Sequence, residues 1–269
     1  MQEWLLIGES LQNKSMYQDV FDSTAPLAAF TYWLIVVVAG KSVTALHILG
    51  SLLLVVQAVI FNTLTIKNKV YEQNTYLPAF AFLIIASTHY SFSVFSPVQL
   101  GITFVLLAFS QLLSHVEFRA KRDEQIMSIG LLIGISGLFY LPLILFLPIV
   151  VLILLIFTNT LSRRYFILII SGMTPVIISI CYYWVTQNSI GFYYSNFLDH
   201  ELSFSFDSYR SIWVNYPLLL PIVFFWVLGL VTLPQQRRLN NYQNRLAQLF
   251  FAIGVLTIGI IGFGSFSIS

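Results

Sequence analysis

The chain has 269 residues, of which 58% are hydrophobic, 16% aromatic and only 9% charged. A water-soluble domain of this size carries about a quarter of its residues as charged side chains, so the composition excludes an ordinary soluble protein. The formal net charge of +2 and the lack of a dense Lys/Arg cluster exclude nucleic acid as a partner, and the single cysteine excludes a disulfide framework.

Residues 1–42 form an acidic segment that contains one short apolar stretch, Pro26–Ala39. This stretch is shorter than the about 17–25 residues that a helix needs to cross a bilayer, so we predict an N-terminal helix lying at the interface. Its Tyr32 and Trp33 favour the headgroup level. An external start without a preceding span implies either an N-terminus that is translocated unaided or a first helix that precedes Met1.

Eight longer hydrophobic stretches follow, separated by short polar segments. Each can cross about 30 Å of hydrocarbon as a helix, which predicts an all-α polytopic membrane protein with about eight transmembrane helices over residues 43–269. An external loop is expected at 185–212, and residues 1–269 are expected to form a single integral membrane domain. The predicted spans are Val43–Ile66, Thr75–Phe92, Pro97–Ser114, Gln125–Phe139, Leu141–Thr158, Tyr165–Trp184, Trp213–Leu233 and Leu246–Phe266.

The orientation of these spans is predicted from their flanking charges. Alternate loops contain ten of the 13 basic residues but only four of the 11 acidic ones. Basic residues are retained on the cytoplasmic side, so these loops are predicted to be cytoplasmic. The ten basic residues are Lys67, Lys69, Arg119, Lys121, Arg122, Arg163, Arg164, Arg237, Arg238 and Arg245.

Polar side chains lie mainly in the two external segments. Asp199, His200 and Glu201 are adjacent and point in different directions, with no further ligand cluster at a recognisable spacing, so we interpret them as a solvated loop and predict no metal site. Arg210 stands among aromatic residues just before a span, where it either binds a lipid phosphate or snorkels to headgroups. Ionisable residues are nearly absent from the spans, which argues against a transporter driven by ions. Gly130-x-x-x-Gly134 is expected to allow close helix packing.

The N-terminal motifs occur in a specific order. An acid at Glu3 is followed by Met16-Tyr-Gln-Asp-Val-Phe-Asp22, by Thr24-Ala-Pro-Leu27 and by Gly40-Lys-Ser42. This order resembles the GT-C superfamily of glycosyltransferases that use polyprenyl-phosphate sugars, and the resemblance covers about 50 of 269 residues. The chain lacks the first span, the Asp-x-Asp pair and the extracytoplasmic domain that are usual in the superfamily.

The resemblance implies an enzyme that transfers a sugar at the outer face of the membrane. Glu3 would be its general base, and Asp19 and Asp22 would orient the acceptor or hold a metal. Lys41 or Arg210 would neutralise the departing lipid phosphate. The implied substrate-binding residues are Lys41, Arg210 and His47, which stands where the superfamily often has arginine.

The middle of the chain is similar to an inner-membrane family of the Bacteroidota that has no assigned reaction. The similarity rests on Asn74-Thr-Tyr-Leu-Pro78, Gly130-Leu-Leu-Ile-Gly134, Phe139-Tyr-Leu-Pro142 and Arg163-Arg164, and it implies a multi-pass protein of the bacterial inner membrane. Two functions remain open: a glycosyltransferase, or a non-catalytic subunit or assembly factor of a cell-envelope polysaccharide, secretion or gliding machine. Expected partners are membrane lipids, a polyprenyl-phosphate-linked sugar and other envelope membrane proteins, with no cofactor.

Overall fold

The computed structural model describes residues 2–12, 14–17, 19, 24–68, 75–87, 94–118, 123–157, 161–187 and 193. These residues form helices and no strand, which confirms the all-α class. Within these described residues, three helical segments are long and apolar enough to cross a membrane, namely Val43–Lys67, Pro97–His115 and Ser162–Thr186. The predicted spans Trp213–Leu233 and Leu246–Phe266, and most of the predicted loop 185–212, lie outside the described residues.

The chain divides into two compact units. The larger unit comprises Met1–Pro148 and Thr160–Leu202, and the smaller comprises Ile149–Asn159 and Ser203–Ser269. The elements are, in order, α1 (Gln2–Ser10), α2 (Pro26–Ala39), α3 (Val43–Lys67), α4 (Leu77–Ser87), α5 (Pro97–Phe118), α6 (Asp123–Phe139), the 3-10 helix η2 (Leu141–Leu145), α7 (Phe146–Phe157) and α8 (Ser162–Gln187).

Helices α2, α3 and α5 begin at the predicted residues, whereas α4, α6 and α8 begin two or three residues away from their predicted starts and α1 was not predicted. Pro26 lies in the first turn of α2, and the hydroxyl oxygen of Ser42 accepts a hydrogen bond from the backbone N–H of Ala45 at the start of α3. The predicted span Leu141–Thr158 differs, since it divides into η2 and α7. Pro142 lies at the start of η2, where its missing N–H and fixed φ suit a first turn.

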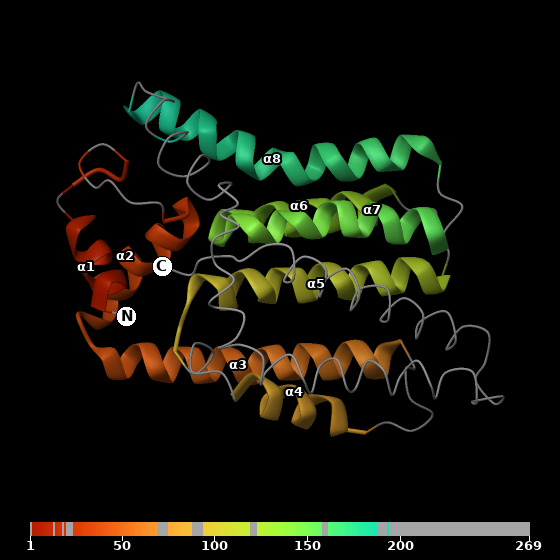
Figure 1. Ribbon diagram of the computed structural model, residues 1–269, viewed down its shortest axis with the longest axis horizontal. Coiled ribbons are helices and arrows are strands. Elements are labelled where there is room, and N and C mark those ends of the chain that lie inside the picture. Colours follow the sequence, from red (N-terminus) through yellow and green to blue (C-terminus); the bar gives the residue numbers. More distant parts are fainter. Residues whose placement is uncertain are drawn as a thin grey trace, which may run out of the picture. The chain divides into compact units, whose positions relative to one another are not determined.

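The long helices of the larger unit run in two directions (Figure 1). Helices α3 and α5 begin at the same end, where the backbone N–H of Phe95 donates to the backbone oxygen of Leu46 (3.1 Å). Helices α6 and α8 begin at the opposite end, where Asp123 pairs with Arg163 and Arg164. Helix α4 packs beside α3, with the rings of Phe61 and Phe82 stacked.

Glycines allow α6 and α8 to pack closely. A Cβ atom added at Gly130 would lie 2.5 Å from the backbone oxygen of Leu168, and one added at Gly134 would lie 2.2 Å from that of Gly172. Real Cβ atoms do not approach backbone oxygens so closely, so larger residues would force the helices apart. The predicted close packing at Gly130-x-x-x-Gly134 is confirmed.

A buried amide network joins α3 to α5. The Nε2 atom of Gln57 donates to the backbone oxygen of Gln99 (2.6 Å) and to Oγ1 of Thr103 (2.9 Å), while Nε2 of Gln99 donates to the backbone oxygen of Gly50 (2.9 Å). Both glutamine side chains are fully buried. The hydrogen bonds from the amide nitrogens link the two apolar helices and hold them in register.

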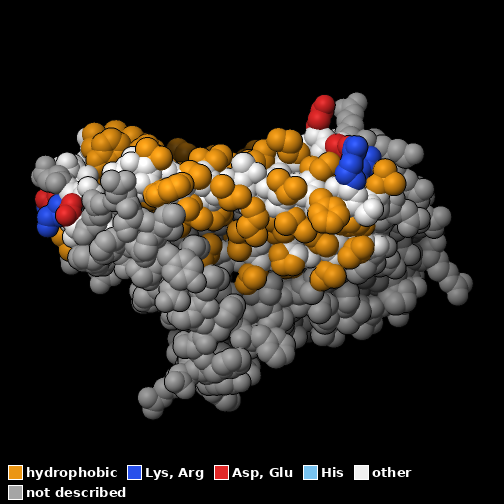
Figure 2. Space-filling view, turned by 90° about the horizontal axis from the view of Figure 1, so that it is seen from above, with side chains coloured by type: hydrophobic (Ala, Val, Ile, Leu, Met, Phe, Trp, Pro, Cys, Tyr) orange, Lys and Arg blue, Asp and Glu red, His pale blue; other side chains and the backbone are white. Residues whose placement is uncertain are grey.

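Helix α8 presents an apolar outer surface. Figure 2 shows hydrophobic side chains covering the face on which α8 lies, with charged side chains gathered towards its two ends. A continuous apolar face of this extent is typical of a surface that contacts lipid or another protein. The large exposed hydrophobic residues of α8 are Phe166, Ile169, Ile170, Met173, Ile177, Ile178, Tyr182, Trp184 and Val185.

Candidate functional site

Helices α1 and α2 form a cap at the end of the larger unit where α3 and α5 begin. The two helices cross closely at Gly8, because a Cβ atom added there would lie 2.7 Å from the backbone oxygen of Tyr32. Glycine therefore permits an approach that a larger residue would prevent. The second half of α2 packs on the starts of α3 and α5 through a cluster of Leu5, Tyr32, Ile35, Val36, Leu46 and Val94.

The first half of α2 packs at the other side of the same end. Tyr183 lies near the end of α8, and Leu141 begins the segment directly after α6. Helix α2 therefore lies across the end of the unit, from α6 and α8 to α3 and α5, as Figure 1 also shows. The first half of α2 belongs to a second hydrophobic cluster, which comprises Met16, Tyr17, Ala25, Ala28, Ala29, Leu141, Tyr183 and Tyr193.

Tyr17 holds the segment that leads into α2. Its φ of 67° lies in the left-handed region, which costs a non-glycine residue about 1–3 kcal/mol. Its buried hydroxyl donates to the backbone oxygen of Thr24 (2.5 Å), and its ring makes edge-on contacts with Tyr183 and Tyr193, at centroid distances of 5.0 and 5.6 Å. These contacts offset the backbone strain and attach the segment to α8.

Burial keeps the phenols of the cap protonated. It raises the pKa of Tyr193 to about 12, and it raises the pKa of Tyr32 well above its ordinary value. A phenol with a raised pKa is a hydrogen-bond donor at neutral pH and is unsuited to act as a base.

The described residues bring only some of the predicted site residues together. The side chain of Glu3, and Asp22 and Arg210 as a whole, lie outside the described residues. Asp19 is exposed, and its carboxylate accepts a hydrogen bond from the backbone N–H of Ser15 (2.9 Å). His47 is partly buried in the second turn of α3.

Lys41 has a partner that was not predicted. Its Nζ atom lies 2.5 Å from Oε2 of Glu9, and both side chains are about half exposed. An exposed pair of this kind contributes about 1 kcal/mol or less. The close crossing of α1 and α2 at Gly8 brings Glu9 towards the turn after α2, and the sequence carries no local signal for that crossing.

At the opposite end, Asp123 joins the starts of α6 and α8. Its Oδ1 atom accepts a hydrogen bond from Nε of Arg164 (2.8 Å), and its other oxygen pairs with Arg163. The hydrogen bonds from Arg164 and Arg163 lower the pKa of Asp123, so the carboxylate is ionised at neutral pH. Arg164 is buried, and the three side chains form a clamp between the two helices.

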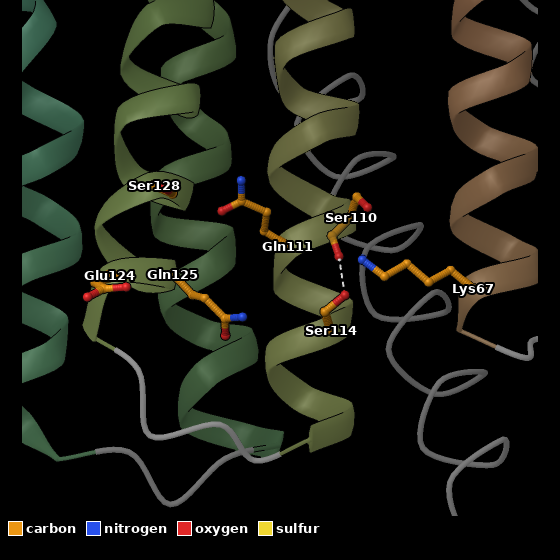
Figure 3. Close-up of a pocket in the computed structure, with 7 residues that line it drawn as sticks. All are labelled: Lys67, Ser110, Gln111, Ser114, Glu124, Gln125 and Ser128. Carbon is orange, nitrogen blue, oxygen red and sulfur yellow. Dashed lines mark hydrogen bonds between the residues drawn. The ribbon is translucent and has the colours of Figure 1, made fainter.

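A polar pocket of about 320 Å³ lies at this opposite end (Figure 3). Every residue that lines it is polar, in a chain that is 58% hydrophobic. The pocket was not predicted, because Lys67 was expected to lie in a cytoplasmic loop. The polar positions 110, 111 and 114 near the end of a predicted span were an available signal. The lining residues are Lys67 on α3, Ser110, Gln111 and Ser114 on α5, and Glu124, Gln125 and Ser128 on α6.

Two contacts behind the pocket orient its lining. The Nδ1 atom of buried His115 lies 3.4 Å from Oε1 of Gln125. The hydroxyl of Ser114 donates to the backbone oxygen of Ser110 (3.0 Å), which leaves the oxygen of that hydroxyl available as an acceptor. The pocket thus combines an ammonium group, a carboxylate, two amides and three hydroxyls.

Comparison with known proteins supplies a family but no activity. The model of a family of unknown function, DUF6427, matches residues 23–264, which include α2, the long helices and all residues of the polar pocket. Searches of the curated proteins and of the solved structures return no match. Because the family model covers most of its length, the chain belongs to the DUF6427 family.

Proposed function

We propose that the chain is a multi-pass protein of the bacterial inner membrane, with about eight spans and with the cap at the outer face. Three described helices have the length and apolar composition for crossing a membrane. The acids Glu9 and Asp19 belong to the segment before α3, whereas Lys67, Arg163 and Arg164 lie at the far ends of the long helices. Basic residues favour the cytoplasmic side, which supports this orientation.

We further propose that the protein transfers a sugar from a polyprenyl-phosphate donor to an envelope acceptor at the cap. The observation that carries this proposal is the position of α2, which lies across the end of the unit and joins α3 through a turn at Gly40 with φ of 63°. An interfacial helix followed by a Gly-Ser-like turn and a span is the arrangement that the GT-C resemblance implies.

In this reaction Glu3 acts as the general base. It takes the proton of the acceptor hydroxyl while the hydroxyl oxygen attacks the anomeric carbon of the sugar, and the bond from that carbon to the phosphate oxygen breaks. The polyprenyl phosphate leaves with an additional negative charge, which Arg210 or Lys41 neutralises. Asp19 and Asp22 orient the acceptor, and His47 contributes to donor binding.

The pairing of Lys41 with Glu9 is compatible with this role. The pair is exposed and weak, so a donor phosphate can replace the Glu9 carboxylate without a large free-energy cost. A phosphate ester offers several acceptor oxygens to the ammonium group, and charge-assisted hydrogen bonds to phosphate are among the stronger ones. Donor binding would then release α1 from the turn after α2.

The proposal is tested with purified protein in lipid vesicles that contain polyprenyl-phosphate-linked sugars. Donor consumption is measured for the natural chain, for Glu3→Gln and for Glu9→Gln, which makes the same change on the same helix. Loss of a general base lowers the rate by about 10²-fold or more, whereas Glu9→Gln should change it only a few-fold. Full activity of Glu3→Gln at a normal protein level would exclude Glu3 as the base.

A second candidate function is a non-catalytic subunit or assembly factor of a cell-envelope machine. Two contacts in the cap favour it, because they occupy side chains that the sugar transfer would need. Lys41 is already paired with Glu9, and the carboxylate of Asp19 already accepts a hydrogen bond from the backbone N–H of Ser15. Under this alternative, Glu3→Gln complements a deletion strain fully, and envelope membrane proteins are retained when the tagged chain is purified in mild detergent. Sugar transfer by the purified chain alone would exclude this alternative.

A further inference from the structure

One oxygen in the amide network between α3 and α5 has no hydrogen bond. Among the residues that the structure describes, no group donates to Oε1 of Gln57, and the residue is fully buried. In the unfolded chain this oxygen is bonded to water, so its burial without a donor is costly, and such atoms are uncommon in native proteins. The oxygen therefore indicates a hydrogen-bond donor that the described part of the chain does not provide.

Gln57 is one of three such residues on α3. The buried side-chain oxygens of Asn62 and Asn68 also lack a donor among the described residues. The amide nitrogen of Asn68 donates within its own helix, to the backbone oxygen of Leu64 (2.7 Å). Of the three, Gln57 has side-chain hydrogen bonds to a second described helix, so its surroundings are the best defined. They lie in the seam where α3 and α5 run side by side (Figure 1).

The contacts of the amide nitrogen fix the orientation of Gln57. Its Nε2 atom donates to the backbone oxygen of Gln99 (2.6 Å) and to Oγ1 of Thr103 (2.9 Å). Rotating the amide by half a turn would place Oε1 against the backbone oxygen of Gln99, where two acceptors repel each other, and would take both N–H groups away from these acceptors. The unpaired oxygen is therefore a consequence of the packing and not of the choice between two amide orientations.

The neighbouring side chains in the seam are engaged elsewhere. The hydroxyl of Thr103 has a single proton, which it donates to the backbone oxygen of Gln99 (3.0 Å). The Nε2 atom of Gln99 donates to the backbone oxygen of Gly50 (2.9 Å). Backbone N–H groups inside the two helices donate along their own helix. The donor for Oε1 of Gln57 must therefore be a molecule that enters the seam.

The chemistry of the seam selects a neutral donor over a cation. Ca²⁺ and Mg²⁺ take about six or more oxygen ligands, whereas the backbone oxygen of Gln99 already accepts hydrogen bonds from Gln57 and Thr103. The ion pairs in the described part of the chain lie at the two ends of the larger unit, so they offer no counter-charge to a cation in the seam. Water is small and uncharged, and it donates two hydrogen bonds.

Thr103 supplies a second acceptor for the same molecule. Its Oγ1 atom accepts a hydrogen bond from Nε2 of Gln57, and a hydroxyl oxygen has a second lone pair. Because Oε1 and Nε2 belong to one amide, Oε1 and the Thr103 hydroxyl lie within reach of a single bridging molecule. We propose that a buried water molecule occupies this seam and donates one hydrogen bond to Oε1 of Gln57 and the other to Oγ1 of Thr103. This site is independent of the proposed sugar transfer.

The direct test is a crystal structure of the purified full chain in a lipid phase, at a resolution that shows ordered water. We expect a density peak about 2.5–3.0 Å from Oε1 of Gln57 and at a similar distance from Oγ1 of Thr103, which is the usual range for hydrogen bonds between oxygens. A protein or lipid group that donates to Oε1, or purely apolar surroundings of that oxygen, would overturn the proposal. A peak with five or more oxygens at metal-ligand distances would overturn it in favour of a cation.

Infrared spectroscopy in lipid vesicles provides an independent readout. Gln57→Glu, protonated at acidic pH, keeps a carbonyl oxygen at the position of Oε1 and a donor at the position of Nε2. The C=O stretching band of the acid is separate from the backbone amide band, and its frequency falls when the oxygen accepts a hydrogen bond. Subtracting the spectrum of the natural chain at the same pH isolates this band. We expect the lower frequency of a bonded acid, and the frequency of an unbonded acid would contradict the proposal.

Variants of Thr103 assign the bond to the bridging water. In the Gln57→Glu background, Thr103→Val removes the second acceptor and should raise the C=O frequency, whereas Thr103→Ser keeps the hydroxyl and should leave the frequency unchanged. An equal frequency in Thr103→Val and Thr103→Ser would refute the bridge. Size-exclusion elution verifies folding. If Gln57→Glu aggregates, the same comparison is made on chains with ¹³C-labelled glutamine side chains, with Gln57→Met as the reference that identifies the Gln57 band.

Discussion

The Nζ atom of Lys41 lies 2.5 Å from Oε2 of Glu9, and this pair joins the turn after α2 to the end of α1. Three further contacts secure the same cap, namely the crossing at Gly8, the Tyr17 hydroxyl bond and the hydrophobic clusters on either side of α2. Packing rather than charge therefore supplies most of the stability of the cap.

Removing the Lys41–Glu9 pair should have a small effect on stability. Lys41→Gln and Glu9→Gln should each lower the free energy of unfolding by about 1 kcal/mol or less, because the pair is exposed. The measurement is thermal unfolding in detergent for both single variants and the double variant. A coupling energy well above 1 kcal/mol would show that the pair is more shielded from water than its exposure indicates.

Asp123 should make stability depend on pH in the acidic range. Its pKa is lower in the folded protein than in the unfolded chain, so its stabilising effect is complete above the unfolded value of about 4 and is lost as the pH falls through the folded value. Asp123→Asn should remove this part of the pH dependence. If the melting temperature falls by the same amount on acidification in Asp123→Asn and in the natural chain, the prediction is wrong.

The glycine contact between α6 and α8 should tolerate no side chain. Gly134→Ala places a Cβ atom against the backbone oxygen of Gly172, which cannot rotate away, so we expect a loss of about 1–3 kcal/mol or more. Gly137→Ala is the matched control on the same helix, because its nearest neighbour is the Ile144 side chain at 3.3 Å. Thermal unfolding of the two variants compares them directly, and equal melting temperatures would refute the close contact.

The proposed orientation is tested by labelling single cysteines with a membrane-impermeant thiol reagent in intact cells. In a Cys181→Ser background, cysteines at positions 19 and 41 should react, whereas cysteines placed next to Lys67 and Arg163 should react only after the cells are opened. The physical basis is retention of Lys67 and Arg163 on the cytoplasmic side. Labelling of the cysteine next to Arg163 from outside would reverse the assignment.

Local signals account for the part of the fold that the sequence predicts well. Proline at position 26, the Ser42 cap and the length of each apolar stretch determine where a helix begins, and α2 keeps its predicted bounds. The division of the predicted span 141–158 was missed, because proline is compatible with the first turn of a helix as well as with a break.

The candidate sites were predicted less well, because they depend on distant contacts. Glu9 meets Lys41 only because α1 crosses α2 at Gly8. The pocket brings together Lys67, Gln111 and Glu124 from three helices, and nothing in the separate segments indicates that their ends converge. Hydrophobic length predicts that a helix crosses a membrane but not which neighbour it packs against.

The position of α2 has a consequence for biosynthesis. Its first half packs against Leu141 and Tyr183, which are synthesised more than a hundred residues later, while its second half packs against Val94. The complete contact surface for α2 does not exist until α8 has been synthesised. Helix α2 therefore waits for most of its packing partners, so a chain truncated before α8 should leave α1 and α2 open to proteases and chaperones.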